Sequence, residues 1–261
     1  MTIEVSTSND VRRDLGGGVL SVTINRAEKR NPLSLGVLDS MRRIFTDAAD
    51  DPAITVAVVT GAGSKAFASG GDLAELSAYR TREEAEAISR HGKAALDAIR
   101  LFPVPVVARL NGVALGGGAE LALACDLRYA SADASFGYIH GRLRISPSWG
   151  GGKDLVRAVG PAKALQLMAT AAILDANEAH ALGVIDQVCP RNTPFDAWFE
   201  ERMAALSQQP RALMRACKSI ALAARTPPGG EADRLETEHF TELWCHDDHW
   251  NAVARRAGSI R

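Results

Sequence analysis

Residues 111–126 read NGVALGGGAELALACD, and the interpretation of the whole chain starts from this stretch. Three consecutive glycines, 116–118, separate an apolar segment from an alanine- and leucine-rich run. This order predicts an extended segment that leads directly into a helix. The first N–H groups of a helix have no partner inside it, and glycines leave them open to a ligand. We therefore expect an anion-binding turn here, with the carboxylate of Glu120 beside it in the first helical turn.

The same residues also fit a purely structural interpretation. A glycine-rich turn can pack closely against a neighbouring helix, and a glutamate in a first turn is favoured by the helix dipole. Because short motifs predict function loosely, these residues alone do not choose between the two interpretations. The rest of the chain has to decide.

The composition is that of an ordinary globular protein, with 261 residues, 46% hydrophobic and 23% charged. The net charge of -1 argues against a nucleic-acid surface. No apolar run approaches the roughly 18 residues of a membrane span, and the first residues, MTIEVSTSND, do not resemble a secretory signal. The cysteines are far apart in sequence, and Cys125 and Cys217 lie in apolar stretches, where we expect reduced core thiols. We expect a cytoplasmic protein.

Strand and helix patterns alternate through most of the chain. Residues 20–24 alternate apolar and polar, and residues 54–60 form a continuous apolar run, so both predict strands. Between them, residues 35–49 show helical spacing behind a possible Ser34 cap. This order favours an α/β fold. Further along we expect helices at residues 83–99, 162–168 and 176–181, and extended segments at residues 104–110, 127–130 and 184–188.

Residues 135–152 have no clear period and contain His140, Arg142, Arg144 and Trp149, so we expect a loop along a pocket. Beyond Pro190 the character changes to three helical patterns. They span residues 195–206, 211–225 and 231 to about 254. Such a terminal helical segment often closes a pocket or forms an oligomer interface.

Two weaker patterns point to other chemistry. Residues 61–66 satisfy the glycine pattern of a dinucleotide-binding turn, but the charged run that follows does not lead to the required second strand and acid. Cys245 and His249 have the spacing of one helical face, but a third metal ligand is not evident, and a surface helix is the better interpretation. We expect no metal site.

Three motifs, in the same order, resemble those of the crotonase superfamily, also called the enoyl-CoA hydratase/isomerase family. Residues 24–34 (INRAEKRNPLS) resemble the family's N-R-P-E-x-R-N-A-L-S loop. Residues 67–73 (FASGGDL) resemble F-x-A-G-x-D-[LI], and residues 111–126 resemble N-G-x-A-x-G-G-G-x-E-L-x-x-x-C-D. The resemblance covers nearly all of the chain. It implies a spiral core of ββα turns at residues 1–194 and a C-terminal helical segment at residues 195–261 that assembles homotrimers, commonly paired into homohexamers.

The resemblance also implies an acyl-CoA thioester substrate, with no cofactor beyond the coenzyme A of that substrate. The thioester oxygen would accept hydrogen bonds from the backbone N–H groups of Gly71 and Gly117, and Glu120 would be the acid/base residue. The resemblance places the coenzyme A portion along a further set of residues: Lys29, Ala66, Ala68, Asp72 and Leu73. Losing one fixed oxyanion donor costs about 3–4 kcal/mol of transition-state stabilisation, so this cradle is the dominant catalytic element.

One position departs from the family's hydratase pattern. Hydratases carry a second glutamate in an F-G-x-P-E motif, and here that stretch reads FGYIH, which puts His140 at the position of the carboxylate. Residues 140–151 (HGRLRISPSWGG) instead resemble the ethylmalonyl-CoA decarboxylase branch. Decarboxylation forms the enolate by loss of CO₂ and needs no activated water. His140 or Arg142 would orient the carboxylate, and Glu120 would deliver a proton if burial raises its pKa.

On this basis we expect an acyl-CoA enzyme that decarboxylates a short-branched malonyl-CoA, such as ethylmalonyl- or methylmalonyl-CoA, through a stabilised enolate. The alternative within the family is an enoyl-CoA hydratase or isomerase that uses Glu120 alone or with His140. His140 also fits the role of a hydrogen-bonded residue of the pocket wall. Two alternatives from other classes are an NAD(P)-dependent oxidoreductase and an inactive acyl-CoA-binding scaffold.

Overall fold

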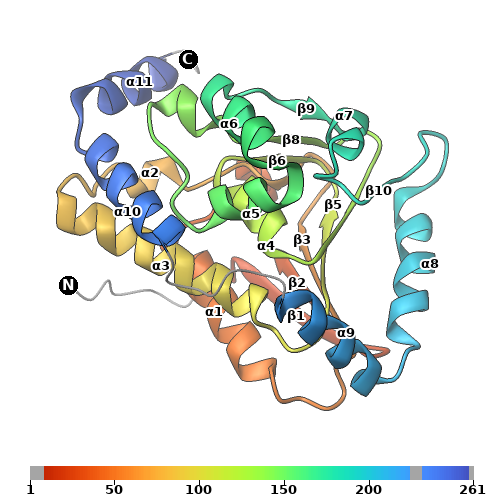
Figure 1. Cartoon of the computed structure of the whole chain (residues 1–261). Coiled ribbons are helices and arrows are strands. Elements are labelled where there is room, and N and C mark those ends of the chain that lie inside the picture. Colours follow the sequence, from red (N-terminus) through yellow and green to blue (C-terminus); the bar gives the residue numbers. More distant parts are fainter. Residues whose placement is uncertain (1–8, 224–230, 259–261) are drawn as a thin grey trace.

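Two sheets whose strands alternate along the sequence form the framework of the molecule (Figure 1). The computed structural model describes residues 9–223 and 231–258. The larger sheet consists, in spatial order, of β1 (Val11–Gly16), β2 (Val19–Ile24), β3 (Val56–Gly61), β5 (Val106–Leu110), β7 (Leu127–Ala130) and β10 (Gln187–Val188). The smaller sheet consists of β4 (Ala66–Ala68), β6 (Val113–Leu115), β8 (Ser135–Gly137) and β9 (Leu174–Asp175).

The predicted spiral of ββα turns is confirmed by this strand order. Consecutive strands come in pairs, of which the first lies in the larger sheet and the second in the smaller one. The pairs are β3 and β4, β5 and β6, and β7 and β8. Helices follow the pairs: α2 (Leu73–Leu76) and α3 (Arg82–Arg100), then α4 (Gly117–Ala124), then α5 (Gly151–Val159). The turn from each second strand into its helix therefore recurs at the same edge of the smaller sheet, where side chains from different turns meet.

The strands and helices show the apolar periodicity and the capping residue that predicted them in the sequence. In β2 the apolar residues Leu20, Val22 and Ile24 are fully buried and alternate with partly exposed ones. The Ser34 side chain accepts a hydrogen bond from the N–H of Val37 at 3.1 Å and caps α1 (Leu35–Ala48) as predicted. Helices α1 and α3 pack against each other and cover the main core. Two shorter helices, α6 (Pro161–Thr170) and α7 (Ala176–Ala181), complete this part of the chain.

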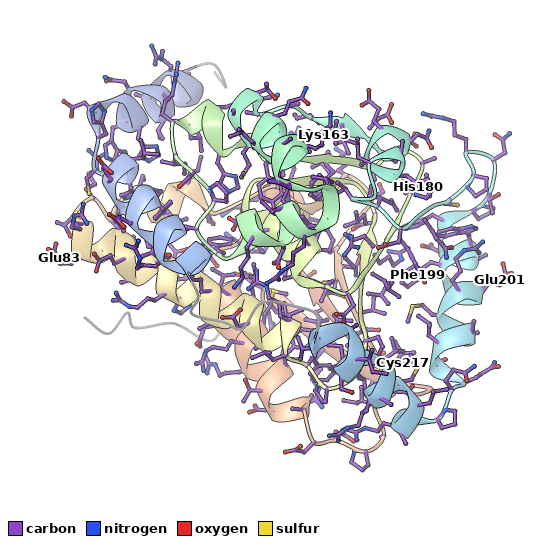
Figure 2. The ribbon with its side chains drawn as sticks, viewed as in Figure 1. Glu83, Lys163, His180, Phe199, Glu201 and Cys217 are labelled. Carbon is purple, nitrogen blue, oxygen red and sulfur yellow. The ribbon has the colours of Figure 1, made fainter. Side chains whose placement is uncertain are left out.

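The C-terminal helices cover two separate parts of the molecule (Figure 1). Helix α8 (Phe195–Ser207) packs on the larger sheet; Figure 2 shows Phe199 facing the sheet and Glu201 facing outward. After α9 (Arg211–Ala223), the helix predicted for residues 231–254 is two helices, α10 (Glu231–Trp244) and α11 (Asp247–Gly258). Helix α10 packs on α3. The start of α8 coincides with the proposed boundary at residue 194, which stays a prediction of domain organisation.

Several sequence-based expectations were wrong. Strand β1 was missed because its polar sequence, VRRDLG, lies exposed at a sheet edge and shows no alternation. The expected loop at residues 135–152 contains β8, the 3₁₀ helix η2 (Ile139–Leu143) and the start of α5. Residues 61–66 lead into β4 rather than a helix, so they lack the helix N-terminus that a dinucleotide-binding turn requires. Cys125 is buried as expected, whereas Cys217 is exposed on α9.

The side chain of Asn111 connects the ends of neighbouring strands. Its amide nitrogen donates to the carbonyl oxygens of Gly61 and Gly63 at 2.8 and 2.6 Å, and its oxygen accepts from the Thr60 hydroxyl at 3.2 Å. The side chain is buried, and so are its hydrogen bonds to the backbone of Gly61 and to the carbonyl oxygen of Ala66, whereas Gly63 is exposed. Asn111 thus fixes the point where the chain enters β6 and the glycine turn after it. Within the described ranges, no helix is long and apolar enough to cross a membrane.

Replacing Asn111 with alanine is expected to lower the free energy of unfolding by about 2–4 kcal/mol. The loss arises because several buried backbone groups are left without partners, each at a cost of about 1–3 kcal/mol less any relaxation. Urea unfolding followed by circular dichroism measures the change. Asn177→Ala, at an exposed position of α7, is the matched control and should shift stability by less than about 0.5 kcal/mol. Equal stability of the two variants would contradict the role given to Asn111.

Candidate active site

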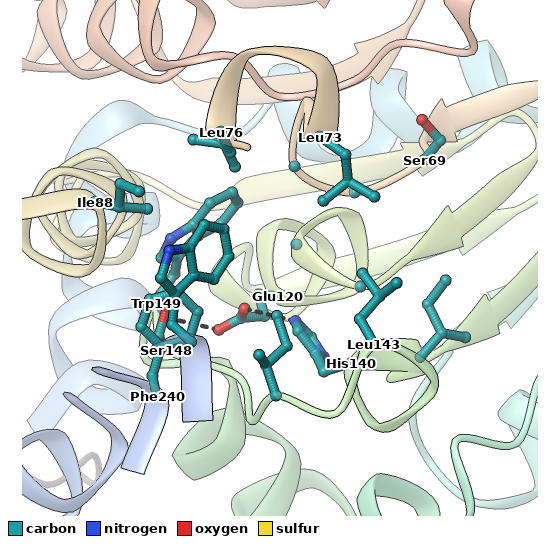
Figure 3. A pocket seen from close by; sticks show the side chains of 17 residues that line it. Ser69, Leu73, Leu76, Ile88, Glu120, His140, Leu143, Ser148, Trp149 and Phe240 are labelled. Carbon is teal, nitrogen blue, oxygen red and sulfur yellow. Dashed lines mark hydrogen bonds and ion pairs between the residues drawn. The ribbon is translucent and has the colours of Figure 1, made fainter. Parts of the chain in front are cut away.

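A pocket opens where the spiral turns meet the C-terminal helices (Figure 3). It encloses about 620 Å³ of empty space, part of it open to solvent. Its walls are mainly apolar and aromatic. The residues that line it are Ser69, Gly70, Gly71, Leu73, Leu76, Ile88, Gly116, Gly117, Glu120, Ile139, His140, Leu143, Ile145, Ser148, Trp149, Phe240 and Trp244.

Two glycine turns lie side by side on one wall of this pocket. A Cβ atom added to Gly70 would lie 3.9 Å from the amide nitrogen of Gly117, and one added to Gly116 would lie 3.8 Å from Cα of Gly70. Both Gly70 and Gly116 have positive φ, +116° and +54°, a conformation that other residues rarely adopt. The residue after each of them, Gly71 and Gly117, lines the pocket. The two predicted backbone donors are therefore brought together.

The carboxylate of Glu120 is held from several sides (Figure 3). One oxygen accepts hydrogen bonds from the backbone N–H groups of Trp149 at 2.8 Å and Gly151 at 3.0 Å. The other lies 3.1 Å from Nε2 of His140. Burial by itself raises the pKa of Glu120, but the hydrogen bond and charge of His140, with the two N–H groups, outweigh it and lower the pKa below the ordinary 4.5. Glu120 is therefore an anion at neutral pH.

This pKa corrects one step of the sequence-based mechanism. We expected burial to raise the pKa of Glu120 so that it could supply a proton. The neighbouring donors lower it instead, so the resting carboxylate is a proton acceptor. His140 Nε2 donates to it, since a carboxylate oxygen only accepts. The other ring nitrogen of His140 is buried with no hydrogen-bond partner among the residues that the structure describes.

The loop that holds Glu120 is itself fixed by a buried arginine that sequence reasoning missed. Arg100, at the end of α3, donates to the carbonyl oxygen of Trp149 at 2.9 Å and forms ion pairs with Asp97 and Asp154 at 2.7 and 2.8 Å. Arg100 is only 4% exposed. An arginine at the end of an amphipathic helix is usually solvated, and only the tertiary structure reveals this contact. Through Trp149, Arg100 positions the carboxylate of Glu120.

The predicted coenzyme A contacts are only partly brought to the pocket. Leu73 lines it, whereas Ala66 and Ala68 are buried in β4, and Lys29 is exposed on the 3₁₀ helix η1 (Ala27–Lys29). The carboxylate of Asp72 forms an ion pair with Arg26 at 2.7 Å. The role of these residues in binding coenzyme A stays a prediction.

Other candidates lie outside the pocket. Arg142, suggested as a partner of a substrate carboxylate, is exposed and donates to the carbonyl of Ala171 at 3.2 Å, and Arg144 is exposed as well. Among the residues of the described ranges that line the pocket, His140 is the only one with a basic side chain. Cys245 and His249 do not share one helix, and within the described ranges no group of three or more His, Cys, Asp or Glu residues could hold a metal ion.

His249 was expected on a surface helix but is fully buried. Its Nδ1 donates to the carbonyl oxygen of Leu143 at 2.7 Å, and its ring packs on Trp244 and Trp250 with centroids 4.7 and 4.6 Å apart. Leu143 and Trp244 both line the pocket. His249 thus attaches α11 to η2, the segment that carries His140. No periodicity in the sequence signals this contact.

Comparison with known proteins agrees with this geometry. The Enoyl-CoA hydratase/isomerase family model matches residues 14–255. A short-chain-enoyl-CoA hydratase of Clostridium acetobutylicum is 32% identical over 250 residues, 94% of this chain and 93% of that protein. A crotonyl-CoA hydratase of Syntrophomonas wolfei is 39% identical over 168 residues, 63% of each chain. The crystal structure of an enoyl-CoA hydratase from Mycobacterium avium subsp. paratuberculosis superposes with a TM-score of 0.86 at 28% identity, covering 96% of this chain and 100% of that one.

A ββα spiral with paired glycine turns and a buried carboxylate defines an acyl-CoA enzyme of the crotonase class. The chain belongs to the enoyl-CoA hydratase/isomerase family. The Clostridium and Syntrophomonas relatives carry hydratase names, and the resemblance to the ethylmalonyl-CoA decarboxylase branch is not shown by them.

Acid is expected to destabilise the protein partly through His249. Burial, together with the charge of Arg80, lowers the pKa of His249 below the ordinary 6.5, against the raising effect of the Leu143 carbonyl. Below about pH 6.5 the unfolded chain therefore binds this proton before the folded one does, so stability falls as the pH falls.

Urea unfolding of the wild type and His249→Phe at about pH 7.5 and about pH 5.5 measures this contribution. The variant keeps an aromatic ring but cannot titrate, so it should lose less stability between the two pH values than the wild type. His180→Phe, at an exposed position of α7, is the control and should behave like the wild type. An unchanged pH dependence in His249→Phe would contradict the prediction.

Proposed function

We propose that this protein is an enoyl-CoA hydratase that adds water across the α,β double bond of an acyl-CoA thioester. The observation that carries the proposal is the buried Glu120 anion placed in the same pocket as the N–H groups of Gly71 and Gly117. A base beside an oxyanion cradle suits a reaction that begins with proton removal and passes through an enolate. The hydratase names of relatives such as the Clostridium protein support the same choice.

The chemistry follows from these groups. The thioester oxygen accepts from the N–H groups of Gly71 and Gly117, which draw electron density away from Cβ. A water molecule donates a hydrogen bond to the Glu120 oxygen that faces His140. As its oxygen bonds to Cβ, its proton passes to Glu120 and the electron pair of the double bond moves to the enolate. Glu120 then returns the proton to Cα, which completes the addition and restores the carboxylate.

His140 holds Glu120 in place and takes the position at which hydratases of the family carry a second carboxylate. Its Nε2–H donates to Glu120, so it stabilises the anion that receives the proton. We therefore propose a hydratase with one carboxylate, in which the same group accepts and returns the proton. Isomerisation of the double bond would use the same two proton transfers, but from one carbon atom to another and without addition of water. It is the alternative reaction for the same groups.

Decarboxylation of a short-branched malonyl-CoA is the second candidate. The observation that favours it is His140 at the second carboxylate position, since loss of CO₂ needs no activated water. Two features weigh against it. The Glu120 anion would repel a substrate carboxylate, and Arg142, which was expected to orient that group, lies outside the pocket.

We also propose that the enzyme works as a homotrimer or homohexamer. Leu213 and Ile220 on α9 are 47% and 74% exposed and lie about two helical turns apart on one face, as expected of a subunit contact.

Incubation with crotonyl-CoA, ethylmalonyl-CoA and methylmalonyl-CoA, followed by mass spectrometry, separates the candidates. The proposal predicts that crotonyl-CoA gains the mass of one water and that the two malonyl thioesters remain unchanged. Loss of the mass of CO₂ from a malonyl thioester would establish the decarboxylase instead. Consumption of none of the three, with retained thioester binding, would favour the inactive scaffold.

Glu120→Gln is expected to lower kcat at least tenfold, about 1.4 kcal/mol, while affinity for a saturated acyl-CoA stays nearly unchanged. Glutamine is isosteric and can still accept the backbone hydrogen bonds, but it cannot accept a proton. Steady-state kinetics and calorimetry measure the two quantities. Glu75→Gln is the matched control, because Glu75 also accepts a backbone hydrogen bond, from Leu35, but does not line the pocket. Wild-type turnover in Glu120→Gln would remove Glu120 from the mechanism.

A further inference from the structure

The indole of Trp149 is enclosed by glycines from three separate parts of the chain. A Cβ atom added to Gly92, in the interior of α3, would lie 2.2 Å from Cδ1 of the indole. One added to Gly117, at the start of α4, would lie 2.4 Å from Cζ3, and one added to Gly71 would lie 3.8 Å from Cη2. Glycine is unfavourable inside a helix, and the indole provides the reason for Gly92. The ring therefore fills the space between α3 and the two glycine turns.

The position of this ring is fixed at its backbone. The N–H of Trp149 donates to Glu120, and its carbonyl oxygen accepts from Arg100 at 2.9 Å. The residue is only 5% exposed. The two hydrogen bonds hold the backbone from which the ring projects, and the ring occupies the space in front of Gly92 and Gly117, so it is closely packed on those sides. It is a rigid wall rather than an adaptable one.

This wall stands where an acyl chain would have to extend. A thioester oxygen held by Gly71 and Gly117 puts the reacting carbons beside Glu120, and Figure 3 shows Trp149 next to Glu120 on the side of Ile88 and Phe240. Further bulky side chains line the same pocket. These are Leu76, Ile88, Phe240 and Trp244, of which Phe240 and Trp244 are 3% and 2% exposed.

We propose that Trp149 is a specificity-determining residue that ends the acyl site just past the reacting carbons and restricts the enzyme to short-chain acyl-CoA thioesters. This inference rests on the proposed function for the orientation of the thioester. Removal of the indole would join the acyl site to the slot in front of Gly92 and admit a longer chain. The backbone N–H that holds Glu120 is present whatever the side chain, so substitution at Trp149 tests the ring and not the carboxylate.

The test compares wild type, Trp149→Phe and Trp149→Ala on two series of thioesters. The first series consists of the reactive crotonyl-, hexenoyl- and octenoyl-CoA, for which kcat/KM of hydration is measured. The second consists of the saturated acetyl-, butyryl- and octanoyl-CoA, for which affinity is measured by calorimetry and no reaction is needed. Trp198→Phe is the matched control, because Trp198, on α8, is buried against the larger sheet and does not line the pocket.

The wild type should prefer crotonyl- over octenoyl-CoA, and butyryl- over octanoyl-CoA, by on the order of tenfold or more. Trp149→Ala should remove or reverse both preferences, Trp149→Phe should reduce them, and Trp198→Phe should keep them. A wild type that accepts the long thioesters as well as the short ones overturns the inference, even if the variants fail to fold. So does a folded Trp149→Ala variant with an unchanged preference.

The two readouts separate this inference from the proposed function. A protein that hydrates none of the enoyl thioesters, but whose preference for butyryl- over octanoyl-CoA disappears in Trp149→Ala, would refute the hydratase and support the role of the ring. A protein that hydrates all chain lengths equally would support the hydratase and refute the role of the ring.

Discussion

The hydrogen bonds from the N–H groups of Trp149 and Gly151 to the carboxylate of Glu120 are the interaction on which the site depends. They join α4, which carries Glu120, to the loop that precedes α5 and to the first residue of α5. A buried carboxylate without such donors would be strongly penalised and would take up a proton. With His140 and these N–H groups it stays ionised in an apolar pocket, and the same loop carries the indole of Trp149, which lines that pocket.

Buried residues around Trp149 hold this interaction in place. Arg100 holds the carbonyl of Trp149 and is itself neutralised by Asp97 and Asp154. A buried arginine is stable only when it is paired in this way. The larger sheet and the core around it form the rigid base against which α3 and α4 are placed. Preorganised donors stabilise a developing charge well because they need not rearrange during the reaction.

The C-terminal helices complete the pocket from outside the spiral. Helix α10 contributes Phe240 and Trp244, and α11 is attached to the 3₁₀ helix η2 through His249. The wall of the pocket that carries His140 therefore depends on residues more than a hundred positions later in the chain. The C-terminal helical segment therefore contributes to the shape of the pocket.

The sequence by itself determined the α/β order, the glycine turns and the place of Glu120 after them, because these depend on local patterns: apolar periodicity, helix capping and glycines at fixed spacing. The spiral of ββα turns was implied by the resemblance of three motifs to the crotonase superfamily, not by periodicity. The sequence predicted neither the low pKa of Glu120 nor the exposed position of Arg142, and it gave no sign of Arg100 or His249 as supports of the site. Only the tertiary structure decided these features, because burial and electrostatic environment depend on contacts between segments far apart in the chain. Such contacts produce no periodic pattern in the sequence of either segment.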